Sequence, residues 1–382
     1  MASLGAVSAA LLVWLSVVAN VHRSCTVGDT PYLPLCGAPA DGAADRLVTL
    51  QRSIGTNPGD AGLYASVARL AVEPGREAAL RAASTLAPND PDVLRARAVL
   101  ALEREDWAAA VPPLVQLTRY YRPVSAEVPE LLARIAGSGH ADLLQPHLLP
   151  GTDWFPLVLD EAVRLKAPLS GMLPLVGHAS ANGALPPDRL RAFVRTLKHR
   201  GQWVDAYGLW LSQHGGRVPI LYNAGFDHNL QPDGFDWEVA PVTGGRAGAV
   251  AGTRPFSHRG QVLEVLYTGN SFPSPAVRQY LLLAPGRYRL AGQYMTAKLR
   301  TEGGLAWSVR CVTGAPEPPA GQSAALADTK GSWLGFDFEI NVPATCGPVA
   351  GLQLETFLPY EAAAGIRGKA YFDSFSLQKL AS

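Results

Sequence analysis

The feature that most constrains the fold is a change in composition near Arg217. Only two of the eleven phenylalanines, Phe155 and Phe193, precede it, and seven of the twelve tyrosines follow it. Before this point the chain is rich in Ala, Leu and Arg with helical spacing of apolar residues, whereas after it short β-branched and aromatic runs alternate with Gly and Pro turns. We therefore predict an α + β multidomain protein, with a helical domain over 57–216 and an antiparallel β-sandwich over 217–382.

Two similar turns in the helical part lie 33 residues apart, measured from Pro58 to Pro91. Residues 57–60 (Asn-Pro-Gly-Asp) and 89–92 (Asn-Asp-Pro-Asp) each combine a turn with residues that cap helix N-termini. Between them, apolar stripes predict two helices in each period. This period, with the small residues Ala98 and Ala110 at the expected helix crossings, resembles the tetratricopeptide repeat, and the resemblance covers about 57–122.

The rest of the helical part is less regular. The pattern Arg-x-x-Trp-x-x-Ala of Arg104 to Ala110 recurs at Arg200 to Ala206, which predicts another helical pair over about 187–213. Prolines interrupt 123–186, where we expect irregular short helices. A repeat solenoid of this type implies a protein partner on its concave face. The alternative is that the helices only support the second domain.

The N-terminus carries an apolar segment of twenty residues without formal charge, from Ala2 to Val21. This length can span a bilayer, so we predict a signal or membrane-anchor helix over 1–23, which contacts the membrane through 2–21 if it is not cleaved. A linker follows over 24–56. The first basic residue, Arg23, comes after the segment, and a strict positive-inside interpretation would leave the body in the cytoplasm.

The four cysteines favour export instead. Cys25 and Cys36 form one local pair and Cys311 and Cys346 another, and no CxxC zinc pattern occurs. Even, domain-local pairing predicts two disulfides and therefore an oxidising compartment. We expect a cell-envelope protein, either periplasmic or anchored in the inner membrane with an exported body. Four free thiols in a cytosolic protein are the alternative.

The second half of the chain has at least seven expected strands, each bounded by turn residues. They cover 261–267, 276–283, 288–295, 305–312, 333–342, 352–358 and 370–380. Alternation along 305–311 places Leu305, Trp307, Val309 and Cys311 on the core face. Along 333–342 it places Leu334, Phe336, Phe338, Ile340 and Val342 inside, and Trp333, Asp337, Glu339 and Asn341 outside.

The two ends of this domain resemble the jelly-roll carbohydrate-binding modules attached to many polysaccharide enzymes. The motifs are 221–227 (Leu-Tyr-Asn-Ala-Gly-Phe-Asp) and 370–377 (Ala-Tyr-Phe-Asp-Ser-Phe-Ser-Leu), and the resemblance covers about 160 residues. It implies glycan binding and a structural calcium near the acidic residues of the first and last strands, here Asp227 and Asp373. Independently, Asp373 shares strand parity with Tyr371 and Phe375, so its carboxylate needs a cation, an Arg or backbone N–H groups.

The glycan-binding candidates are the outward-facing residues Trp333, Asp337, Glu339 and Asn341, with Arg310 and Ser308 on another strand. An aromatic ring can stack on a pyranose while carboxylate and guanidinium groups bind its hydroxyls. Any half-solvated antiparallel sheet shows a mixed polar face, which is the alternative. We expect Trp237 to be a core or loop anchor.

No hydrolase elbow, phosphate-binding loop, zinc-protease or dinucleotide motif occurs, and a net charge of +1 offers no general attraction for nucleic acid. We therefore predict a non-catalytic envelope protein, whose helices bind a protein and whose sandwich binds polysaccharide, accessory to exopolysaccharide assembly or export by analogy of architecture. The alternatives are a purely structural interaction factor and a glycoside hydrolase that uses Asp337 and Glu339. No cofactor is predicted beyond the structural calcium that the resemblance implies.

Overall fold

The computed structural model describes residues 42–120, 127–240, 247–313 and 318–381. The chain divides into two compact units, one up to Pro186 and one from Pro187. The predicted N-terminal apolar segment and the pair Cys25 and Cys36 lie outside the described residues. Within the described ranges, no helix is both apolar and long enough to cross a bilayer.

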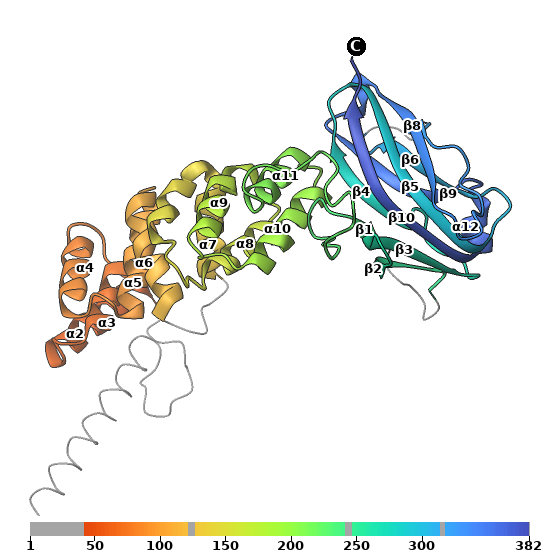
Figure 1. The fold of residues 1–382 in the computed structure, drawn as a ribbon. Helices are drawn as coiled ribbons and strands as arrows, with labels where there is room; N and C mark the ends of the chain where they lie inside the picture. Colours follow the sequence, from red (N-terminus) through yellow and green to blue (C-terminus); the bar gives the residue numbers. More distant parts are fainter. Residues whose placement is uncertain (1–41, 121–126, 241–246, 314–317, 382) are drawn as a thin grey trace, which may run out of the picture. The chain divides into compact units, whose positions relative to one another are not determined.

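The first unit consists of helices (Figure 1). Its regular helices are α2 (Ala43–Thr56), α3 (Ala61–Leu70), α4 (Gly75–Leu86), α5 (Pro91–Glu103) and α6 (Trp107–Tyr120). The side chains of Asp60 and Asp90 cap α3 and α5 by accepting hydrogen bonds from the N–H groups of Gly62 and Asp92, as the two turn motifs predict. The two helical pairs α3–α4 and α5–α6 therefore occur where expected, whereas a tetratricopeptide solenoid stays a prediction.

The proline-rich part of the first unit forms short elements, as predicted. They are α7 (Glu127–Ile135), η1 (Ala136–His140), η2 (Ala141–His147), α8 (Phe155–Arg164), η3 (Ser170–Met172) and α9 (Leu173–Ala181). The η1 segment is a π-turn that contains Gly139 at a φ of 96°. That left-handed backbone favours glycine and separates α7 from η2.

The second unit begins with α10 (Pro187–His199) and α11 (Trp203–Ser212), which form the helical pair expected over 187–213. The two helices group with the sandwich, whereas the change in composition near Arg217 predicts that they belong to the helical domain. The reason is their apolar face, because Trp203 packs on Tyr280 and Trp210 packs on Tyr222. Gly234 makes room for Trp210, since a Cβ there would lie 2.2 Å from the indole nitrogen.

The sandwich has two antiparallel sheets (Figure 1). Sheet A has the order β1-β4-β9-β6-β7, with β1 (Glu238–Val239), β4 (Val277–Leu282), β9 (Val349–Thr356), β6 (Leu305–Cys311) and β7 (Gly321–Gln322). Sheet B has the order β2-β3-β10-β5-β8, with β2 (Ala249–Phe256), β3 (Gly260–Thr268), β10 (Arg367–Lys379), β5 (Gly286–Arg300) and β8 (Leu334–Val342). A short helix, α12 (Tyr360–Ala364), and a 3-10 turn, η4 (Ala344–Cys346), connect strands.

The core between the sheets is aromatic. Trp237, Trp307, Phe226, Phe372 and Phe375 lie in one cluster, with Trp237 fully buried as expected. Burying large aromatic rings supplies much of the stability of such a core. On β6, the residues Leu305, Trp307 and Val309 face the core and Cys311 packs against it, as alternation predicts. Cys311 forms the predicted disulfide with Cys346.

Two details of strand parity differ from the prediction. Leu334 is 48% exposed, although it was assigned to the core face. In β10 a bulge lies between Asp373 and Ser376, where Ser374 adopts a φ of 54°. The bulge reverses the alternation, so Phe375 faces the core whereas Tyr371 and Asp373 face outward, and they do not share one face as predicted.

Candidate functional site

The structure separates the predicted glycan-binding residues onto two opposite faces of the sandwich. Trp333, Asp337, Glu339 and Asn341 lie on or beside β8, on the outer face of sheet B. Arg310 and Ser308 lie on β6, on the outer face of sheet A, because Trp307 and Val309 face the core. Arg310 and the Trp333 group therefore cannot contact one sugar residue.

The outer face of sheet A has a closed polar network centred on Glu355. Its carboxylate accepts hydrogen bonds from Ser308 at 2.8 Å, Arg310 at 3.3 Å and Gln353 at 2.8 Å. The Arg310 and Ser308 donors thus already have a protein acceptor.

The helical pair covers another part of this face. Lys198 of α10 donates to the Gly234 carbonyl at 2.7 Å and to Glu238 at 2.6 Å. Its ammonium lies 4.9 Å from the ring centre of Tyr280. Burial lowers the pKa of the Lys198 amine, and the nearby Glu238 carboxylate opposes this shift. These contacts attach α10 to sheet A.

The outer face of sheet B has a second apolar cluster, which we call the aromatic half. It contains Phe256, Val262, Met295, Ala297, Trp333 and Tyr371. The Phe256 ring centre lies 5.5 Å from those of both Trp333 and Tyr371. The Arg259 guanidinium lies 4.1 Å from the centre of the half-buried Trp333 ring, so it covers one face of the predicted stacking platform.

Two buried carboxylates lie beside these rings. Glu264 pairs with Arg254 at 3.1 Å and with Lys369 at 3.3 Å. Asp373 pairs with Arg259 at 3.2 Å and accepts the N–H of Ser374. Burial, together with the hydrogen bond and charge of Glu264, raises the pKa of Tyr371 to about 12.

Two polar atoms of the same face are buried without a hydrogen-bond partner in the described residues. They are Oε1 of Gln293 and Nε1 of Trp333. Gln293 lies directly opposite Asp373 in the β5–β10 register. A buried acceptor or donor without a partner loses its hydration with no compensation, so these atoms favour a ligand that has hydroxyl groups.

The remaining candidates form what we call the far half of this face. Asp337 pairs with Arg289 at 2.9 Å and Glu339 pairs with Arg287 at 2.8 Å, in both cases across β8 and β5. All four side chains are half exposed or more, and Asn341 is exposed. Such pairs contribute little stability each.

The expected calcium site has a different arrangement. Asp373 is held by Arg259 and by a backbone N–H, the alternative that we kept open, and Asp227 is exposed near Gly260. Throughout the part of the chain that the structure describes, no group of three or more His, Cys, Asp or Glu side chains could hold a metal ion. A calcium site therefore stays an untested prediction.

Sequence reasoning missed Phe256 of the aromatic half, and its charged neighbours Arg254 and Arg259, because it missed strand β2. Arg254 and Phe256 belong to β2, and Arg259 lies in the turn that follows it. Gly252 and Pro255 are uncommon in strands and therefore obscured the strand pattern, although Pro is tolerated in an edge strand such as β2. The available signal was alternation, which places Arg254 and Phe256 on one face and Thr253 and Pro255 on the other.

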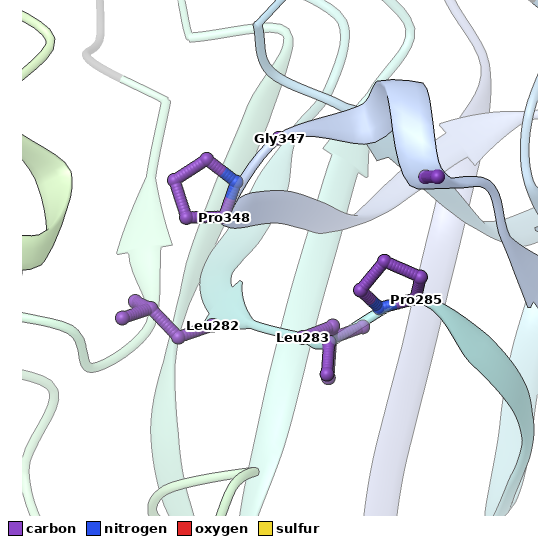
Figure 2. Close-up of a pocket in the computed structure, with 7 residues that line it drawn as sticks. Leu282, Leu283, Pro285, Gly347 and Pro348 are labelled. Atoms are coloured by element: carbon purple, nitrogen blue, oxygen red, sulfur yellow. The ribbon is translucent and has the colours of Figure 1, made fainter.

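A hollow elsewhere in the sandwich is unsuited to a sugar. It lies between the turn after β4 and the loop before β9, and Figure 2 shows Leu282, Pro285 and Pro348 around it. All its lining residues are apolar or glycine. Sugar recognition needs polar groups as well as rings, so the aromatic half is the better candidate.

Comparison with known proteins finds similarity in structure alone. No protein-family model matches the chain, and no curated protein matches it. Similar solved structures are carbohydrate-binding modules that match the C-terminal sandwich. A CBM4 module is 15% identical, with a TM-score of 0.32, over 42% of this chain and 99% of its own. The CBM22-1 xylan-binding domain of Paenibacillus barcinonensis Xyn10C is 14% identical, with a TM-score of 0.31, over 42% of this chain and 93% of its own.

A third solved structure is TmCBM61 in complex with β-1,4-galactotriose. It is 18% identical, with a TM-score of 0.26, over 43% of this chain and 100% of its own.

Proposed function

We propose that the second unit is a glycan-binding module whose site is the aromatic half of sheet B. The observation that carries this proposal is the combination of three neighbouring rings, Phe256, Trp333 and Tyr371, with buried polar atoms that have no hydrogen-bond partner among the described residues. Rings pack against the apolar face of a pyranose, and its hydroxyl groups can both donate and accept hydrogen bonds.

The rest of the proposal concerns the whole chain. We propose a non-catalytic scaffold of the cell envelope, whose helices bind a protein partner and whose sandwich binds polysaccharide during exopolysaccharide assembly or export. The Cys311–Cys346 disulfide supports an oxidising compartment. Asp337 and Glu339 each pair with an arginine of β5, which supports a structural role for these two carboxylates.

The test is binding of the full chain to a glycan array, with Trp333→Ala as the variant. Loss of the ring should weaken binding by about tenfold or more, since an aromatic contact contributes on the order of 1–2 kcal/mol. Leu334→Ala is the matched control, because Leu334 is the next residue and is exposed. Equal loss in both variants, or no glycan bound by the wild type, would refute the site.

The alternatives have their own readouts in the same experiment. An interaction factor without sugar affinity would bind a protein partner and no glycan. Release of new reducing ends from a bound glycan would contradict the non-catalytic proposal.

A further inference from the structure

The ion pairs beside the aromatic half are not balanced. Their cations are Arg254, Arg259 and Lys369, and their carboxylates are Glu264 and Asp373. Three cations therefore share two carboxylates, and the exposed carboxylate of Asp227 lies near Gly260. In the far half the ion pairs are balanced, with two arginines facing two carboxylates.

The depth of these groups differs as much as their number. The side chains of Arg254, Lys369 and Arg259 are 59%, 37% and 27% exposed, whereas those of Glu264 and Asp373 are 11% and 8% exposed. The carboxylates lie beneath the cations, and each is occupied by at least one of them. A ligand that approaches the rings therefore meets guanidinium and ammonium groups first.

We propose that the glycan bound here is acidic, with carboxylate groups of the uronic acid type. This inference rests on the proposed glycan-binding function and adds the class of ligand. A guanidinium binds a carboxylate through two parallel hydrogen bonds, and Arg254 contacts Glu264 through Nε, at the inner edge of its guanidinium. A neutral sugar would offer no second carboxylate to this exposed guanidinium beyond Glu264.

The arrangement of Arg259 adds to this selectivity. The central carbon of its guanidinium lies 4.1 Å from the Trp333 ring centre, and Asp373 pairs with Nη1 at 3.2 Å. These two contacts restrain the guanidinium beside the ring, so less conformational entropy is lost when an acid group binds.

The experiment compares acidic glycans with their neutral counterparts on the same backbone. Alginate, polygalacturonate and hyaluronate are each measured against the carboxyl-reduced form, with the full chain. We expect at least one acidic polymer to bind about tenfold or more tightly than its reduced form at low salt. Raising sodium chloride from about 20 mM to about 500 mM should weaken that binding several-fold, because screening acts on exposed charges.

Two variants locate the effect. Arg254→Gln and Lys369→Gln should each weaken acidic-glycan binding about three- to tenfold and weaken binding of the reduced form less. Each variant leaves Glu264 with its other cation, which preserves the fold, and melting temperatures check this. Arg289→Gln, on the same face but in the far half, is the control and should have no effect.

The outcomes separate the two proposals. If reduced forms bind as well as the acidic forms, glycan binding stands and the acidic ligand is refuted. If Arg289→Gln weakens binding as much as Arg254→Gln, a general surface charge is responsible and the site is wrong. If neither acidic nor neutral glycans bind, both proposals fail.

Discussion

The two outer faces of the sandwich use similar residues for opposite purposes. On sheet A, Glu355 accepts hydrogen bonds from Ser308, Arg310 and Gln353, and elsewhere Lys198 joins helix α10 to Glu238. On sheet B, three rings lie together beside polar atoms that have no partner in the described residues. A polar strand face is thus not evidence for a ligand unless its hydrogen-bonding groups remain unused.

The comparison also explains why charge alone is a poor guide to the site. Asp337 and Glu339 are the most conspicuous acidic residues in the sequence of β8, but each is neutralised by an arginine of β5. The less conspicuous Arg254 and Arg259 come from a strand and a turn that contain Gly and Pro. Cross-strand pairing decides which charged side chains remain available to a ligand, and this pairing depends on the order of strands in the sheet.

The largest effect is expected from the disulfide, which belongs to sheet A. Cys311 ends β6 and Cys346 precedes β9, so the bond closes a loop with a sequence separation of 35. Replacing both residues by Ser should lower the free energy of unfolding by about 3–4 kcal/mol, mainly because the unfolded chain gains freedom. Urea unfolding of both proteins under oxidising conditions measures the loss.

The same double variant sharpens the contrast between the faces. At a temperature where it is still folded, it should bind glycan like the wild type, because the bond lies outside the aromatic half. Wild-type protein in reducing buffer is the control and should match the variant. Equal unfolding midpoints in oxidising buffer would contradict a stabilising role for this bond.

A smaller loss is expected when the helical pair is detached from sheet A. In Lys198→Met the ring contacts can persist, but the buried Gly234 carbonyl loses its donor and Glu238 keeps only Arg278. Breaking one side of a buried pair should lower the free energy of unfolding by about 2–4 kcal/mol. Thermal melting measures this, and limited proteolysis should show earlier cleavage between α10 and β1.

Arg195→Met is the matched control on the same helix. Arg195 pairs with Asp233 at 2.5 Å, but both side chains are exposed. Its loss should cost less than about 1 kcal/mol. Similar losses in the two variants would mean that α10 is not held by its buried amine, and the structural role of this face would be wrong.

Much of the fold could be predicted from sequence because its signals are local. Alternation identified the seven longer strands of the two sheets other than β2, and helical spacing identified the pair that became α10 and α11. The location of that pair could not be predicted, because the apolar face with Trp203 and Trp210 suits a neighbouring helix as well as a sheet. Periodicity shows that a face is buried and not what covers it.

The site could be predicted only in part, for a related reason. Trp333 was correctly predicted to lie outside the core. The pairing of β8 with β5 could not be predicted, because alternation within a strand does not show which strand is its neighbour. Arg310 was grouped with Trp333 because β6 and β8 both alternate, although these strands belong to different sheets. The bulge at Ser374 requires a residue with positive φ, and serine gives no such signal, so the outward position of Tyr371 was missed.

The smallest effect, and the most specific to the aromatic half, concerns the ionisation of Tyr371. Its pKa is raised to about 12, chiefly by burial and then by Glu264, whereas an unfolded tyrosine titrates near 10. The fold therefore favours the neutral phenol. This contribution to stability is complete below about pH 10 and is lost as the pH rises from about 10 through about 12, because the unfolded chain releases its proton first.

Tyr371→Phe removes that dependence along with one hydrogen bond, which should cost about 1 kcal/mol at pH 7. Between pH 10 and 11, wild type and variant should show nearly the same tyrosinate absorbance, since Tyr371 is still protonated in the wild type. A difference in tyrosinate absorbance that is already complete at pH 10.5 would mean that the Tyr371 hydroxyl is solvated and that the aromatic half is not a packed site.

Tyr280→Phe gives the matched measurement on sheet A, where burial and Glu238 raise the pKa of Tyr280 while Arg278 lowers it. If a bound acidic glycan raises the pH at which tyrosinate forms in the wild type but not in Tyr371→Phe, the hydroxyl proton of Tyr371 reports ligand binding at sheet B. Tyr280, which lies under the helices, should show no such change.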